Sequence, residues 1–199
     1  MYFKRLLNPA DLNTSAFLFG PRMTGKTTLL RKVKTDDYFD LLDPELELQY
    51  RSRPKLFWEQ VSVLPKGAII VIDEIQKVTQ LLNYVQMGID QYNHFYFLSG
   101  SSARKLKQGG ANLLGGRALD LKLHPLTFTE IGKFFNLNHA LQYGTIPKIC
   151  SLVVEEKWNL VIGHLRSYIT TYIKEEIQAE AITRNLGAFQ RFLDIAAQN

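Results

Sequence analysis

The sequence has a single cysteine, Cys150, so no disulfide can form within the chain. Its four histidines are scattered and show none of the spacings that zinc ligands have. No stretch approaches the about 18 consecutive apolar residues that a membrane helix needs, and the N-terminus lacks the apolar core of a secretory signal. These absences argue against disulfide-stapled, zinc-binding and membrane-spanning proteins. The sequence therefore predicts a cytoplasmic protein with no membrane partner.

The bulk composition is that of an ordinary globular protein. Hydrophobic residues make up 46% of the 199, which is enough for one sizeable core, or for one domain and part of another. The net charge is +5, from 24 basic and 19 acidic residues. Several of the basic residues fall within 22–34, where a bound nucleotide would account for them. The net charge is therefore only weak support for a nucleic-acid partner.

One glycine-rich segment follows the phosphate-loop pattern G-x-x-x-x-G-K-[ST] in full. Its residues are Gly20, Pro21, Arg22, Met23, Thr24, Gly25, Lys26 and Thr27. The apolar run before it, 15–19, is typical of a buried strand, and 28–34 after it has the apolar spacing of a helix. Such a loop points backbone N–H groups and the positive end of a helix at a phosphate. We expect these residues, together with Thr28, to bind the phosphates of a nucleotide.

Two side chains of this loop have roles of their own. Lys26 is long enough to reach the β- and γ-phosphates of the nucleotide. The hydroxyl of Thr27 is placed to ligate Mg²⁺, which prefers hard oxygen ligands. The alternative is a glycine-rich turn that contains Lys-Thr by chance.

A second signal is the run 68–72, which is apolar, rich in β-branched residues and typical of a strand buried on both faces. It ends in Asp73 and Glu74. A carboxylate at the carboxyl end of a central parallel strand points into the crevice where such sheets bind ligands. We expect Asp73 to hold Mg²⁺ through its water shell, and Glu74 to orient and deprotonate an attacking water. A plain cap at the end of the strand is the alternative.

A third strand is expected at 94–98, followed by small and polar residues that include Ser99 and Ser101. A hydroxyl at the end of a strand beside the phosphate loop can touch the γ-phosphate or the attacking water. We therefore expect Ser99 to contact the nucleotide and Ser101 to assist the reaction. A turn made of small residues is the alternative.

Arg117 follows two glycines and precedes a further expected strand at 119–123. An arginine in such a place can stabilise charge on a phosphoryl group in transfer, in its own subunit or in a neighbouring one. A surface arginine or a structural ion pair is the alternative. The nearby basic residues Arg104, Lys105 and Lys107 are more typical of a solvated face than of a binding patch.

Several of these motifs together resemble those of a known family. The segments that carry the resemblance are Phe19–Thr27, Asp73–Lys77, Gly100–Leu106, Asn112–Arg117 and Pro125–Thr127. They are similar to the prokaryotic AAA-type ATPases of the STAND-like branch, whose members carry a C-terminal domain of unknown function. The resemblance spans most of the chain.

The resemblance implies an α/β fold of the AAA-type P-loop NTPase class, with a parallel five-stranded sheet in the order 5-1-4-3-2. It implies that the nucleotide is ATP, bound with Mg²⁺, and it gives a γ-phosphate-sensing role to the region from Ser99 to Ser101. Arg117 matches a Gly-Arg pair of the family. Adenine preference comes from the resemblance alone.

The chain is expected to have two parts. Residues 1–124 form the ATPase core, in which strands alternate with helices. Residues 125–199 form a helical lid and the start of a further region. The chain stops within a helical pattern, whereas family members continue past this point, so we expect a truncation of a longer protein.

The expected function is hydrolysis of Mg-ATP to ADP and phosphate, which drives or gates a conformational change. The alternative is a nucleotide switch of slow turnover that tethers DNA or a partner protein. A small-molecule kinase is less consistent with the sequence, because it needs no water-activating acid such as Glu74. The partners expected are ATP and a second copy of the chain or another protein, with nucleic acid only weakly supported.

Overall fold

The computed structural model describes residues 1–101, 106, 114–173 and 186–196. The chain divides into two compact units, Met1–Lys133 and Phe134–Asn199. The phosphate loop and the acids Asp73 and Glu74 all belong to the first unit.

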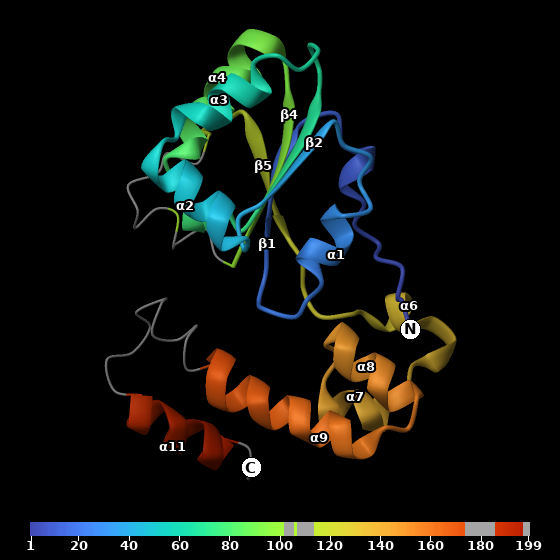
Figure 1. Ribbon diagram of the computed structural model, residues 1–199. Coiled ribbons are helices and arrows are strands. Elements are labelled where there is room, and N and C mark those ends of the chain that lie inside the picture. The colour runs from blue at the N-terminus through green and yellow to red at the C-terminus, as the bar shows by residue number, and fades with distance from the viewer. Residues whose placement is uncertain (102–105, 107–113, 174–185, 197–199) are drawn as a thin grey trace. The chain divides into compact units, whose positions relative to one another are not determined.

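A five-stranded sheet forms the centre of the first unit (Figure 1). Its strands are β1 (Ser15–Phe19), β2 (Asp37–Asp40), β3 (Ile69–Asp73), β4 (Phe95–Gly100) and β5 (Ala118–Lys122). They lie in the order β2-β3-β4-β1-β5, and every neighbouring pair is parallel. This is the order that the family resemblance implies, so the predicted fold class is confirmed.

Helices cover both faces of the sheet because its central strands are apolar on both sides. On one face lie α2 (Pro44–Ser52), α3 (Lys55–Val61) and α4 (Leu81–Tyr92), and on the other lies α1 (Lys26–Leu30) (Figure 1). Successive residues of β1 alternate between the two cores, with Phe17 on the side of the three helices and Leu18 on the side of α1. Both side chains are fully buried.

Local sequence signals set the bounds of these helices. The Asp43 side chain caps α2 by accepting from the backbone N–H of Glu45, and Pro44 is the first helical residue. Pro54 separates α2 from α3, because proline cannot continue the hydrogen bonding of a helix. Asn93 ends α4 in a left-handed conformation, with φ of 54°. Short 3-10 turns lie at Pro9–Asp11 (η1) and at Ile75–Lys77 (η2).

The chain that leaves β5 enters α6 (Phe128–Ile131), which begins with a capping box between Thr127 and Glu130, and then the 3-10 turn Gly132–Phe134 (η3). Glu130 also holds the N-terminal segment, because it accepts from the backbone N–H of Leu6 and pairs with the Arg5 guanidinium at 3.3 Å. Both charged side chains are buried, so each depends on the other for its charge to be compensated.

The described residues of the second unit are helical. They form α7 (Leu137–Tyr143), α8 (Pro147–Val154), α9 (Trp158–Ser167), a π-helical segment (Tyr168–Ile173) and α11 (Leu186–Ala196). A small core of Ile149, Leu152 and Val161 joins α8 to α9. Nowhere in the described chain does a helix have the length and hydrophobicity that crossing a bilayer requires.

The packing of the sheet predicts the effect of a cavity at its centre. Leu98 on β4 is fully buried, so we expect Leu98→Ala to lower the free energy of unfolding by about 2–5 kcal/mol. Val63 is 81% exposed, and Val63→Ala should change the free energy of unfolding by no more than about 0.5 kcal/mol. Urea denaturation of the two variants measures both values. Equal stability of the two would contradict this account of the core.

Candidate nucleotide-binding site

The strands of the sheet all run in the same direction, so the segments that follow them gather at one edge. The phosphate loop leaves β1 there, Asp73 ends β3 and Gly100 ends β4. Because β4 lies between β1 and β3, the loop and the two acids flank the end of the same central strand. We call this side of the sheet the carboxyl edge.

The loop starts with a close backbone approach that only glycine allows. A Cβ on Gly20 would lie 2.3 Å from the carbonyl oxygen of Leu123, on the chain that leaves β5. The backbone N–H of Leu123 donates to the carbonyl of Phe19 at 2.7 Å, which holds the two chains together. Gly25, with φ of 92°, then turns the chain into α1.

The ammonium group of Lys26 lies inside the loop. Its Nζ donates to the carbonyl oxygens of Gly20 at 2.8 Å and Pro21 at 3.1 Å, and the residue is only 6% exposed. The Thr24 hydroxyl donates to the same Pro21 carbonyl at 2.8 Å. The loop is therefore closed around a cation, which is the arrangement that an anionic ligand requires.

The remaining loop residues lie nearer the surface. Pro21, Arg22 and Thr28 are exposed, whereas Met23 and Thr27 are half-buried. Met23 has φ of 64°, a left-handed conformation that side chains rarely adopt.

Asp73 is fully buried at the end of β3, and both of its carboxylate oxygens accept hydrogen bonds. The Ser99 hydroxyl on β4 donates to Oδ1, and the Tyr38 hydroxyl on β2 donates to Oδ2 at 3.0 Å. The neighbouring strands on both sides thus fix the carboxylate that the sequence predicts to hold Mg²⁺.

Ser99 holds both acids through its hydroxyl. It is fully buried, and its hydroxyl accepts from the backbone N–H of Glu74 at 2.9 Å while it donates to Asp73. The structure therefore places Ser99 as a support for Asp73 and Glu74. Its predicted contact with the nucleotide stays a prediction.

Tyr38 is a residue of the site that the sequence reasoning missed. Burial, and then the charge of Asp73, raise the pKa of its hydroxyl, so this hydroxyl keeps its proton and remains a donor. Arg31, the residue after α1, pairs with Asp40 at 3.1 Å, and its guanidinium lies beside the same hydroxyl. In the register of β2 and β3, Tyr38 is paired with Val71, and Val71 is two residues before Asp73 on β3. Only that register could have revealed the contact.

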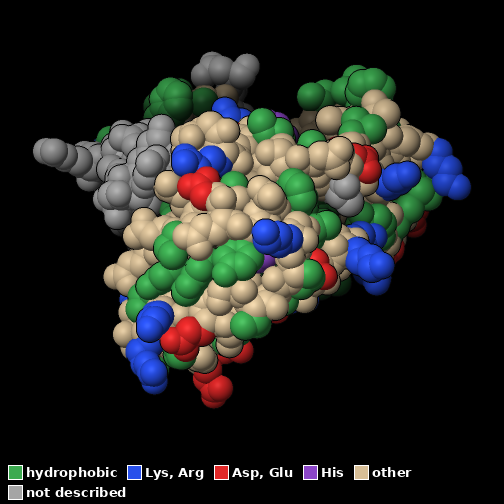
Figure 2. Space-filling model, turned by 90° about the horizontal axis from the view of Figure 1, so that it is seen from above, with side chains coloured by type: hydrophobic (Ala, Val, Ile, Leu, Met, Phe, Trp, Pro, Cys, Tyr) green, Lys and Arg blue, Asp and Glu red, His purple; other side chains and the backbone are tan. Residues whose placement is uncertain are grey.

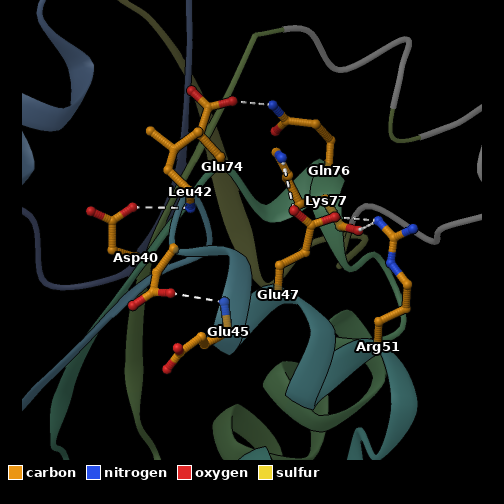
Figure 3. A network of polar contacts seen from close by, with 9 residues as sticks. Asp40, Leu42, Glu45, Glu47, Arg51, Glu74, Gln76 and Lys77 are labelled. Carbon is orange, nitrogen blue, oxygen red and sulfur yellow. Dashed lines mark hydrogen bonds and ion pairs between the residues drawn. The ribbon is translucent and has the colours of Figure 1, made fainter.

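Glu74 follows Asp73 in a left-handed conformation, with φ of 61°, and its side chain is half-buried. The conformation turns the chain from the end of β3 into η2. Gln76 of η2 donates from Nε2 to the Glu74 carboxylate, and the two side chains point toward one another (Figure 3).

The helix α2 holds the far end of η2. Glu47 pairs with the Lys77 ammonium at 2.8 Å, and Arg51 donates to the Lys77 carbonyl at 3.0 Å (Figure 3). Arg51 also pairs with Glu47, so the three side chains form one network. The turn that carries Glu74 and Gln76 is therefore fixed at Ser99 on one side and at α2 on the other.

Ser101 comes directly after β4, at the carboxyl edge. Its hydroxyl oxygen is buried and has no hydrogen-bond partner within the described chain. The basic residues Arg104, Lys105 and Lys107 lie outside the described residues. The predicted role of Ser101 stays a prediction.

Arg117 lies at the other end of the sheet, because it precedes β5 rather than following a strand. Its guanidinium pairs with Asp90 at 2.7 Å, near the end of α4, and this hydrogen bond lowers the pKa of the Asp90 carboxyl. A five-residue strand separates it from the carboxyl edge by about 16 Å. The structure thus places Arg117 away from the loop of its own chain, in an ion pair with Asp90, and its predicted role in phosphoryl transfer stays a prediction.

The oxygens at the carboxyl edge suit Mg²⁺. This cation takes few protein ligands and keeps several waters, so one carboxylate and one hydroxyl are an adequate set. Asp73 and Thr27 are the residues that the sequence predicts for this role. Among the described residues, no group of three or more His, Cys, Asp or Glu side chains could hold a metal ion.

The sequence matches the AAA domain family over residues 13–132, which is more than half of the chain. The chain belongs to this AAA domain family. The first unit is accordingly an AAA-type P-loop ATPase domain, and nucleotide binding is a property of the family.

Other similarities cover smaller parts. The uncharacterized protein MJ1544 of Methanocaldococcus jannaschii is 35% identical over 79 residues, which are 40% of this chain and 18% of that protein. The chain thus spans a small part of this relative.

Among solved structures, the replication initiator DnaA, bound to AMPPCP and single-stranded DNA, is 13% identical, with a TM-score of 0.45 over 85% of this chain and 59% of that one. A katanin structure that concerns self-assembly is 18% identical, with a TM-score of 0.41 over 61% and 44%. Both scores are too low to add to the fold assignment.

The hydrogen bond from Tyr38 to Asp73 predicts a defect in metal use. We expect Tyr38→Phe to raise the Mg²⁺ concentration for half-maximal nucleotide binding about tenfold, since residues that orient a metal ligand commonly matter to that extent. Tyr84→Phe is the control, because Tyr84 stacks on Trp58 away from the acids. A Mg²⁺ titration with a fluorescent ATP analogue measures both, and equal midpoints would contradict the role of Tyr38.

Proposed function

We propose that this AAA domain binds Mg-ATP at residues 20–28 and hydrolyses it to ADP and phosphate, and that the cycle drives or gates a conformational change. One observation carries the proposal. The loop that encloses Lys26 and the two acids Asp73 and Glu74 flank the same strand end, and Asp73 is fixed by hydroxyls from both sides.

When a nucleotide binds, phosphate oxygens replace the loop carbonyl oxygens as acceptors for the Lys26 ammonium. In the structure Lys26 donates to loop carbonyls, and β- and γ-phosphate oxygens are stronger acceptors because they are charged. The backbone N–H groups at the start of α1 supply further donors. Thr27 and Asp73 would hold Mg²⁺, whose charge, when bound, offsets that of the phosphates.

Glu74 is the proposed general base. Its carboxylate takes a proton from a water, the water oxygen forms a bond to the γ-phosphorus, and the bond from that phosphorus to the β,γ-bridging oxygen breaks, with the electron pair going to ADP. The fixed turn keeps this carboxylate apart from that of Asp73, so one acid serves the metal and the other serves the water.

A cavity beside α1 is the proposed place for the base and ribose of the nucleotide. It has a volume of about 900 Å³ and is lined by the N-terminal segment, by Leu29 of α1, by Lys32 just after that helix, and by Glu130. The helix α1 is five residues long, so this cavity lies within about 8 Å of the loop along the helix axis. That separation suits a nucleoside whose phosphates are in the loop.

We propose that Arg117 acts on a neighbouring copy of the chain. Its ion pair with Asp90 is at the surface, and such pairs contribute about 0–1 kcal/mol, so a phosphate of another subunit can compete for the guanidinium. On the face shown in Figure 2, described basic side chains are scattered among acidic and apolar ones, which gives a nucleic-acid partner no added support.

The division of roles predicts a separation of binding from turnover. Glu74→Gln should bind Mg-ATP within about threefold of the unchanged protein and slow phosphate release at least about 100-fold. Glu45→Gln, at an exposed position, is the matched control. Lys26→Ala provides the reference that does not bind. The rate of phosphate release and the affinity for an ATP analogue, measured for each variant, test this separation of binding from turnover. Full turnover by Glu74→Gln would mean that another group is the base.

The role of Arg117 predicts complementation between subunits. Arg117→Ala should slow turnover by about 10³-fold with little loss of ATP affinity. Mixing Arg117→Ala with Glu74→Gln should restore part of the phosphate release, because each inactive copy supplies what the other lacks. Lys66→Ala is the control, because Lys66 is an exposed cation that precedes β3, at the same end of the sheet as Arg117. Turnover of Arg117→Ala at the unchanged rate, or no recovery in the mixture, would contradict action between copies.

A further inference from the structure

The side chain of Gln76 has one partner and one unused group. Its Nε2 donates to the Glu74 carboxylate (Figure 3), whereas its carbonyl oxygen Oε1 is buried and accepts no hydrogen bond from the described residues. A buried acceptor without a donor is uncommon in folded proteins, and it calls for a reason.

The unused oxygen lies at the carboxyl edge. A Cβ built on Gly100 would be 3.1 Å from Gln76 Oε1, so this oxygen lies against the last residue of β4. Gly100 is paired in the sheet with Phe19, the residue before the phosphate loop. Gln76 therefore reaches from the turn after β3 across the end of β4, toward the strand that carries the loop.

The backbone of Gln76 has little freedom to move. Glu74 is anchored to Ser99 before it, and Lys77 is held by Glu47 and Arg51 after it. The terminal torsion of a glutamine is soft by comparison, so the amide can turn while its backbone stays in place. Any motion that brings Oε1 to a ligand is thus a small one.

We propose that Gln76 orients the attacking water for Glu74. The water donates one hydrogen to Gln76 Oε1 and the other to the Glu74 carboxylate, which leaves a lone pair of its oxygen directed at the γ-phosphorus. Glu74 removes the proton, and Gln76 stays neutral throughout. This inference rests on the proposed hydrolysis, and it assigns a second residue to the same water.

The contact between Gln76 and Glu74 is also compatible with the opposite effect on hydrolysis, and an experiment distinguishes the two. If Gln76 restrains Glu74 and keeps it from the water, removal of its amide must raise the turnover number. If Gln76 orients the water, removal must lower it. The sign of the change therefore decides between the two.

The test compares Gln76→Met with Gln80→Met. Methionine keeps the length of the side chain without its amide, and Gln80 is exposed four residues further on. For Gln76→Met we expect kcat of Mg-ATP hydrolysis to fall about 10- to 100-fold, with the ATP dissociation constant within about threefold of the unchanged protein. Affinity for ADP with aluminium fluoride, which mimics the transferring phosphoryl group and its water, should fall while affinity for ADP alone does not.

Gln76→Asn provides a second variant in case methionine disturbs folding, because it withdraws the acceptor by one carbon and should also lower kcat. An unchanged or raised kcat, or a fall in ATP affinity that accounts for the whole effect, overturns the role of Gln76. If the unchanged protein hydrolyses ATP and Glu74→Gln stops it, such a result leaves the proposed function intact. No hydrolysis by the unchanged protein overturns both.

Discussion

The organisation of this domain depends on one buried carboxylate. Asp73 has no contact with solvent, and a buried charge is tolerated only when its oxygens are hydrogen-bonded. Its two partners come from different strands, Tyr38 from β2 and Ser99 from β4, so the requirement that stabilises the charge also fixes the register of three adjacent strands. Fold and site are therefore not separable at this point, since the groups that align the sheet also aim the acid.

The next residue extends this arrangement to the surface of the domain. Glu74 shares the Ser99 hydroxyl with Asp73, and its turn is held by α2 through Lys77. A displacement of α2 would be transmitted to the carboxylate through one ion pair, Lys77 with Glu47, and one contact of Arg51 with the Lys77 carbonyl. On the other side of the sheet, Arg31 connects α1, the helix that follows the loop, to Tyr38 and Asp40. The two acids are thus linked by short chains of contacts to the helices on both faces.

The sequence predicts most of the fold and the principal residues of the site, for identifiable physical reasons. Apolar runs of strand length, punctuated by a motif with fixed geometry, locate the strands and the loop, and the resemblance supplies their order. Neither the sequence nor the resemblance shows which side chains meet across neighbouring strands. Tyr38 lies outside every motif, and Gln76 lies inside the segment Asp73–Lys77 without a role of its own there, because their contacts arise from register and from the left-handed turn at Glu74. Ser99 was expected just after a strand at 94–98, whereas it lies within β4, where its hydroxyl bonds to Asp73 and to the backbone of Glu74. The position of Arg117 could have been foreseen, because in an all-parallel sheet a residue that precedes a strand lies at the end opposite to the ligands.

The first glycine of the loop is explained by the fold before any ligand is considered. Gly20 touches the carbonyl of Leu123 so closely that the outgoing chain from β5 occupies the volume of any side chain. A lineage of this protein that had lost all use for ATP would still be unable to replace Gly20 without rerouting the chain after β5. By contrast, the Lys26 ammonium donates to carbonyls of the loop itself, so these contacts shape the phosphate loop and not the strands of the sheet. The motif thus combines a residue kept by architecture with a residue kept by chemistry, and relaxed selection would distinguish them.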